Sequence, residues 1–150
     1  MQWKPNTTVA AIIERDGRFL MVHEHTPQGV RLNQPAGHLE YGETLTAAVA
    51  REAQEETGYR ATATALVGIY LADKEGSADI TYLRFAFACQ AGADAERSQL
   101  DDGIIEAVWL SADEIHARQA IWRSPLVGRC LDDYLAGQRL PLSAIHHQGR

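Results

Sequence analysis

The most informative segment of the chain is GHLEYGETLTAAVAREAQEETGY, at residues 37–59. Its second part predicts an α-helix from about Thr44 to Thr57, and Gly58 is a typical C-terminal stop. One face of this helix changes character along its length, because its first turns are apolar and its last turns are acidic. Such a helix buries apolar side chains at its start and collects negative charge at its end.

Three glutamates form the acidic end of this helix: Glu52, Glu55 and Glu56. Their spacing of i, i+3 and i+4 places them within an arc of about 100°. Like charges at this spacing repel one another, and partial burial increases the cost. A cluster of oxygen ligands without His or Cys suits Mg²⁺, for which Mn²⁺ can substitute. The alternative is a solvated acidic face, in which Arg51 and Glu55 form an ordinary i, i+4 ion pair.

Strand and turn signals flank the helix on both sides. A β-rich run at residues 8–13 leads through Asp16-Gly17 into residues 19–22, which predicts a β-hairpin. Residues 26–42 are rich in glycine and proline, so we expect a structured loop there. Further strands are expected at residues 62–71, 80–89 and 104–110.

Two helices are expected after the last strand. Residues 111–114, SADE, fit the Ser-x-x-Glu capping box and open a short helix. Ser124-Pro125 marks the start of a final helix, whose apolar stripe continues until Gly137. This stripe can pack internally or form a dimer face, so a monomer and a homodimer both agree with it. The order of elements predicts an α/β fold with a mixed β-sheet covered by helices on both faces.

Length and composition restrict the class of protein. The 150 residues suffice for a single domain spanning residues 1–150 and leave no room for a second catalytic domain. No apolar run approaches the roughly 20 residues of a membrane-spanning helix, and no secretion signal is present, so we expect a cytoplasmic protein without membrane contact. The net charge of −6 argues against binding to nucleic acid polymers. The two cysteines are expected to be buried, reduced thiols: Cys89 and Cys130.

The quoted stretch resembles the signature of the Nudix hydrolases, the MutT-like family. That signature reads Gly, five residues, Glu, seven residues, Arg-Glu, an aliphatic residue, any residue, Glu-Glu, any residue, Gly and an aliphatic residue. Its seven fixed places are filled here by Gly37, Glu43, Arg51, Glu52, Glu55, Glu56 and Gly58. Such a match has a chance on the order of 10⁻⁹ per register. Ala53 and Tyr59 stand where a larger aliphatic residue is commoner. The resemblance implies the Nudix fold, an α/β/α sandwich.

The resemblance also implies the roles of the signature residues. The metal ligands would be Glu52, Glu55, Glu56 and the carbonyl oxygen of Gly37. Glu43 and Arg51 would support them, with Arg51 holding a glutamate in orientation. The general base varies within the family.

Two residues are candidates for this general base. Glu52 is one of them. Glu106 is the other, although an exposed carboxylate at the end of a strand explains it equally well. Asp101 and Asp102 are weaker alternatives, because both resemble loop residues near a turn.

Candidates for substrate binding lie outside the helix. Arg84 alternates with apolar residues on an expected strand, so it can contact a phosphate or face solvent. His38 precedes the helix, where a structural role is also compatible with it. Asn33 offers an amide group that can select a base.

The family resemblance implies a Mg²⁺-dependent pyrophosphohydrolase, in which water attacks a phosphorus of a small nucleotide or pyrophosphate substrate. Residues 33–40, 123–127 and 137–142 are also similar to the NudJ-type subgroup of small bacterial Nudix phosphatases. That subgroup implies nucleoside tri- and diphosphates as substrates, and also the pyrophosphate of the thiamine pyrimidine precursor (HMP-PP). Residues typical of ADP-ribose and dinucleoside polyphosphate members are missing. The alternative is a catalytically silent Nudix-like module that binds nucleotides or regulates a partner, although such modules often have an eroded signature.

Overall fold

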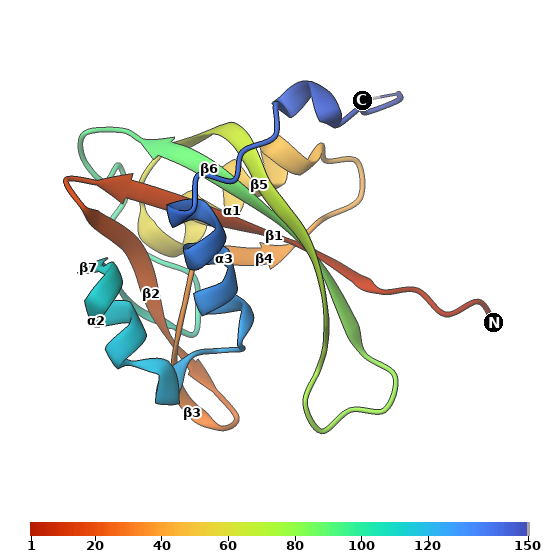
Figure 1. The fold of residues 1–150 in the computed structure, drawn as a ribbon, viewed down its shortest axis with the longest axis horizontal. Helices are drawn as coiled ribbons and strands as arrows, with labels where there is room; N and C mark the ends of the chain where they lie inside the picture. The colour runs from red at the N-terminus through yellow and green to blue at the C-terminus, as the bar shows by residue number, and fades with distance from the viewer. Residues whose placement is uncertain (150) are drawn as a thin grey trace.

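The computed structural model describes residues 1–149, in which a seven-stranded mixed β-sheet has helices on both faces (Figure 1). The strands are β1 (Asn6–Arg15), β2 (Arg18–Thr26), β3 (Gly29–Asn33), β4 (Ala36–His38), β5 (Ala61–Asp73), β6 (Thr81–Ala91) and β7 (Ile104–Ser111). The helices are α1 (Leu45–Thr57), α2 (Ala112–Ala117) and α3 (Leu126–Leu135), with short 3₁₀ turns η1 (Gln119–Ile121) and η2 (Leu142–Ala144). None of the helices in this part of the chain is long and apolar enough to span a membrane.

The strand order is β3-β2-β1-β6-β5, and β4 pairs with β1 while β7 pairs with β2. The β1–β6 pairing is parallel and the other pairings are antiparallel. The predicted hairpin is confirmed, because Glu14 of β1 pairs with Phe19 of β2. Asp16 and Gly17 between them have positive φ angles, as this tight turn requires. The three later strands are confirmed as β5, β6 and β7.

The expectation of a loop at residues 26–42 is wrong in part, because this segment contains β3 and β4. β3 returns along β2 after a turn in which the Thr26 hydroxyl donates to the carbonyl oxygen of Gly29 at 2.7 Å. β4 pairs with β1, from which it is distant in sequence. Both strands are short and lack a regular hydrophobic period, so strand pairing rather than local pattern defines them.

Successive side chains of a strand point to opposite faces of the sheet, so each face carries its own hydrophobic core. On one face, Val9 and Ala11 of β1 pack in a cluster with Val49 of α1. On the other face, Ala10 packs in a cluster with Leu131 of α3. Each core holds one of the two buried free thiols, Cys89 and Cys130. The apolar stripe of α3 therefore packs internally, and the predicted sandwich of helices around a mixed sheet is confirmed (Figure 1).

Local signals set the ends of the helices as predicted. Thr44 caps α1, because its hydroxyl oxygen accepts a hydrogen bond from the backbone N–H of Ala47 at 3.1 Å. Gly58 ends α1 with a φ of 81°, a conformation that favours glycine. Ser111 and Glu114 form the complete capping box of α2. The helix that carries the acidic residues is thus fixed at both ends.

Candidate active site

The last two turns of α1 carry the three glutamates in an inward-facing position. Glu52 and Glu56 are each only 8% exposed, and Glu55 lies beside them at intermediate burial. The helix lies at this depth because Val49 and Ala53 are fully buried in the core between α1 and the sheet. Apolar packing of the helix therefore draws its acidic end into the protein.

Arg51 lies at the centre of a hydrogen-bond network among the signature glutamates. Its Nε and Nη2 atoms donate to the two carboxylate oxygens of Glu43, at 2.6 and 2.9 Å. Its Nη1 atom donates to Glu52 at 2.8 Å and to Glu55 at 3.2 Å. Nη2 also donates to the carbonyl oxygen of His38 at 3.0 Å. These five bonds engage all five N–H donors of the guanidinium, so Arg51 holds the glutamates in fixed orientations.

The strand β4 lies directly against the acidic end of α1. Glu56 Oε1 accepts a hydrogen bond from the backbone N–H of Ala36 at 2.9 Å. Gly37 approaches Glu52 so closely that a Cβ atom at this position would collide with the carboxylate. Glycine is required here because it alone leaves space for the Glu52 carboxylate.

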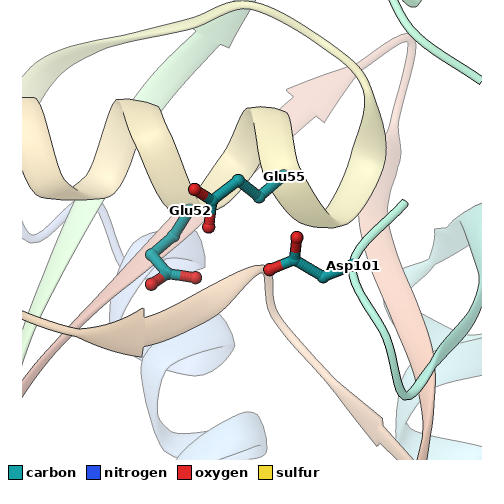
Figure 2. A group of neighbouring side chains, drawn as sticks. All are labelled: Glu52, Glu55 and Asp101. Carbon is teal, nitrogen blue, oxygen red and sulfur yellow. The ribbon is translucent and has the colours of Figure 1, made fainter. Parts of the chain in front are cut away.

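Asp101 joins this group from the connection between β6 and β7. Carboxylate oxygens of Glu52, Glu55 and Asp101 lie within 4.8 Å of one another (Figure 2). The backbone N–H of Asp101 donates to the carbonyl oxygen of Glu55 at 2.9 Å, which fastens the connection to α1. The sequence makes Asp101 only a weaker candidate, because no local signal distinguishes it from Asp102. Tertiary structure thus brings Asp101 to Glu52 and Glu55, whereas the Glu56 carboxylate is bound to the backbone of β4 and is not part of this group of three.

Glu106 does not belong to this carboxylate cluster. Its alternate neighbours in β7, Val108 and Leu110, pack in the core on the α3 side, so the Glu106 side chain lies on the sheet face opposite α1. Its contact is His23 of β2, with 3.3 Å between Nδ1 and Oε1. Of the two candidates for the general base, the structure brings only Glu52 to the cluster.

Burial alters the acid–base behaviour of the cluster. Burial raises the pKa of Glu52 above its ordinary value, although the hydrogen bond from Arg51 opposes this shift. Burial also raises the pKa of Glu56 to about 8, and the charges of neighbouring carboxylates add to the increase. The hydrogen bond from Arg51 instead lowers the pKa of Glu43. Without a cation, ionisation of Glu52 and Glu56 at the buried end of α1 is therefore unfavourable.

The donor set fits a hard divalent cation. The converging ligand atoms are carboxylate oxygens, and no His or Cys takes part in the group within residues 1–149. Mg²⁺ typically binds a few carboxylates together with waters and substrate phosphates, and Mn²⁺ accepts the same ligands. A cation would also offset the cost of ionising Glu52 and Glu56 at their buried positions. The residues present are therefore suited to Mg²⁺ or Mn²⁺.

Arg84 is buried rather than solvent-facing, at 7% exposure. Its Nη2 atom donates to Asn33 Oδ1 at 3.2 Å, and Nη1 donates to Gln34 Oε1 at 3.3 Å and to Cys130 Sγ at 3.7 Å. Within the described chain, all of its hydrogen-bond partners are neutral. Arg84 is thus a buried positive charge without an ion-pair partner among these residues.

His38 lies exposed at the end of β4. Its ring is next to that of Tyr82, with 6.4 Å between the ring centroids, and it lines a surface hollow together with Tyr41. Thr8 of β1 pairs with His38 on one side and with Arg84 on the other. The Cα atoms of His38 and Arg84 are therefore about 10 Å apart, across one intervening strand. The Arg84 side chain donates to Cys130 of α3 and lies on the same side of β6 as Ala86, so it is on the sheet face opposite α1.

A comparison of the chain with known protein families gives a match that is consistent with the fold and with the acidic end of α1. Residues 3–130 match the family described as NUDIX domain. The chain therefore belongs to the Nudix family.

Particular relatives cover almost the whole chain. Phosphatase NudJ from Escherichia coli K12 is 38% identical over 146 residues, which are 95% of this chain and 92% of that protein. A solved NUDIX hydrolase from Nitrosomonas europaea is 47% identical, with a TM-score of 0.92, and covers 98% of this chain and 100% of that chain. A MutT NUDIX hydrolase from Burkholderia pseudomallei is 21% identical, with a TM-score of 0.73 and coverage of 87% and 98%. At this lower identity, the last comparison shows the shared fold alone.

Proposed function

We propose that this chain is a Mg²⁺-dependent pyrophosphohydrolase, in which water attacks a phosphorus of a small phosphorylated substrate. The observation that carries the proposal is the buried carboxylate group at the end of α1, with Asp101 beside it. Membership of the Nudix family supports this reaction class. Similarity to proteins named Phosphatase NudJ favours a phosphatase within that class.

The proposed metal ligands are Glu52, Glu55, Glu56, Asp101 and the carbonyl oxygen of Gly37. When bound, Mg²⁺ would neutralise charge on the phosphates and lower the pKa of a coordinated water. Arg51 and Glu43 have a positioning role, because the guanidinium joins Glu43 to Glu52 and Glu55. This arrangement keeps the carboxylates oriented when a substrate approaches.

Glu52 is the proposed general base. Its Oε1 atom accepts the hydrogen bond from Arg51, which leaves Oε2 to accept a proton from the attacking water. Glu106 receives no role in this proposal, because its contact is His23 and it does not belong to the group of Glu52, Glu55 and Asp101.

The proposed substrates are nucleoside tri- and diphosphates and HMP-PP. His38 and Asn33 are proposed contacts for the organic part of the substrate. Arg84 carries a buried charge with neutral partners, so an oxygen of the substrate would supply the missing electrostatic compensation.

The test measures release of phosphate and pyrophosphate from a panel of substrates, with Mg²⁺ and with EDTA. The panel contains nucleoside tri- and diphosphates, HMP-PP, ADP-ribose and diadenosine polyphosphates. We expect chelator-sensitive release from the first two groups. The ratio of phosphate to pyrophosphate would identify the bond that is cleaved.

Matched variants test the assigned residues. Glu52→Gln and Glu56→Gln are each expected to lower kcat by at least about 10²-fold. Glu75→Gln, at an exposed turn, removes the same charge away from α1 and serves as the control. Near wild-type activity in Glu52→Gln and Glu56→Gln would contradict the proposed roles. Mg²⁺-dependent nucleotide binding without any release would instead favour the catalytically silent module.

A further inference from the structure

An ion pair beside the carboxylate group joins two segments that are distant in sequence. Arg123, in the connection between η1 and α3, donates from Nη1 to Glu24 Oε1 at 2.9 Å. Glu24 lies near the end of β2, and 99 positions separate the two residues. The family signature contains neither residue, and the function proposed above uses neither.

The backbone fixes Arg123 at the outer edge of β3. Its N–H donates to the carbonyl oxygen of Leu32 at 2.8 Å, and the preceding Trp122 forms a parallel bridge with Leu32. Trp122 is itself anchored, because its indole N–H donates to the carbonyl oxygen of Ile115 at 2.9 Å. The backbone of Arg123 is therefore held rigidly at the edge of the sheet, and its side chain extends from this fixed point.

Glu24 directs this ion pair toward the face of the sheet that carries α1. Glu24 lies on the same side of β2 as Leu20, which packs in the core beneath α1. The backbone also joins this end of β2 to the connection that carries Asp101, because Glu24 pairs with Ile104 and the N–H of His25 donates to the carbonyl oxygen of Gly103 at 2.7 Å. Glu24 and its partner Arg123 thus lie at the border of the carboxylate group.

Two other arginines lie near this border. Arg51 uses all five of its N–H donors within the protein. Arg31, which pairs with Glu24 across β2 and β3, turns back and donates from Nη1 to the carbonyl oxygen of Val30 at 2.9 Å. Arg51 therefore has no N–H donor left for an anionic substrate, and Arg31 is turned toward its own strand, whereas the Arg123 guanidinium keeps free donors beside Glu24.

Arg123 has the freedom that such a contact requires. Its side chain is 45% exposed, whereas its partner Glu24 is only 14% exposed. Among the contacts of residues 1–149, the guanidinium makes a single hydrogen bond, which leaves its other N–H groups available. Guanidinium groups bind phosphate through two parallel N–H donors, a geometry that a partly exposed Arg123 can supply.

We infer that Arg123 is a phosphate-binding residue of the active site, held in place by Glu24 and facing the carboxylate group across the substrate. The inference rests on the proposed function, because it assigns the contact to a phosphate of that substrate. The guanidinium would donate to oxygens of a phosphate, while the carboxylates on α1 face the same phosphate chain from the other side. Arg123 therefore adds substrate affinity that the signature residues do not provide.

The test compares Arg123→Gln and Arg123→Lys with Arg18→Gln. Arg18 also forms a single exposed ion pair, with Glu114, and it lies at the opposite end of β2, about 20 Å from Glu24. We expect Arg123→Gln to lower kcat/KM for nucleoside triphosphates by about 10- to 100-fold, mainly through KM. Arg123→Lys should recover part of this loss, and Arg18→Gln should stay within about 2-fold of wild type. Thermal unfolding of each variant shows whether it is still folded, so that a higher KM can be assigned to weaker substrate binding.

Binding of inorganic tripolyphosphate identifies the group that Arg123 contacts. Isothermal titration in the presence of Mg²⁺ should show weaker tripolyphosphate binding in Arg123→Gln, because this ligand contains phosphate and no base. Unchanged KM and unchanged tripolyphosphate affinity in a folded Arg123→Gln variant would overturn the inference while hydrolysis by the wild type continues to support the proposed function. If the wild type hydrolyses nothing, the proposed function fails, and the same titration still decides the role of Arg123.

Discussion

Asp101 contributes a carboxylate to the acidic end of α1 from a connection that the family signature does not include. We predict that Asp101→Asn lowers kcat/KM by about 10- to 100-fold, because it removes charge and an oxygen ligand from the group. Steady-state kinetics over a range of Mg²⁺ concentrations should show a higher Mg²⁺ requirement. Asp94→Asn, exposed in the same connection, is the matched control and should behave as wild type. Equal activities of the two variants would remove Asp101 from the site.

At Gly37 the backbone lies very close to the carboxylate of Glu52, the proposed general base. We predict that Gly37→Ala lowers kcat by about 10²-fold, because its Cβ atom would displace the carboxylate of Glu52. Gly92→Ala is the control, since the nearest atom to a Cβ there, the carbonyl oxygen of Arg60, is 3.8 Å away. Kinetics and thermal unfolding should be measured together. Full activity in Gly37→Ala would show that the close approach has no catalytic consequence.

At the scale of elements, the C-terminal segment supports the start of α1. His147 Nε2 accepts a hydrogen bond from the backbone N–H of Leu45 at 3.1 Å, a donor that the first turn of a helix leaves free. Leu142 and Ile145 of the same segment pack against the core beneath α1. The segment therefore stabilises the helix that carries the carboxylates.

This support can be measured by chemical denaturation. We predict that His147→Ala lowers the free energy of unfolding by about 1 kcal/mol, because the N–H of Leu45 loses its acceptor. His146→Ala is the control, since the hydrogen-bond partner of the exposed His146 ring among residues 1–149 is the exposed Gln148 side chain. A loss in both variants of equal size would assign the effect to the segment as a whole rather than to the cap.

At the scale of the whole molecule, the buried carboxylates make stability depend on pH and metal. Burial raises the pKa of Glu56 from 4.5 to about 8, so the folded, metal-free protein retains a proton that the unfolded chain loses. Stability is therefore highest below the unfolded value and falls as pH rises toward the folded value. We predict that the metal-free protein loses about 2–3 kcal/mol of unfolding free energy between about pH 6 and about pH 8.5.

Urea denaturation in EDTA at the two pH values tests this dependence. Glu56→Gln should remove most of it, because the amide does not ionise. Added Mg²⁺ should restore stability more strongly at the higher pH, since the cation binds the ionised carboxylates of the folded state. Metal-free stability that is constant or increases over this range would contradict the buried, proton-retaining state of Glu56.

The sequence determines the elements that depend on local signals. The hairpin at Asp16-Gly17 and the ends of α1 at Thr44 and Gly58 follow from turn and capping chemistry, which acts between neighbouring residues. The short strands β3 and β4 were expected as a loop, because their pairing partners rather than their own pattern make them strands. That residues 1–150 form one independent domain stays a prediction.

The same division applies to the site. The three glutamates share one face of α1 because of their helical spacing, which can be read from the sequence. The approach of Asp101 to Glu52 and Glu55, and the absence of Glu106 from this group, depend instead on a connection folding onto α1 and on which sheet face α1 covers. Likewise, the burial of Arg84 and the position of Arg123 beside Glu24 arise from packing between distant segments. Local spacing sets which charges share an element, whereas long-range packing sets which elements share a site.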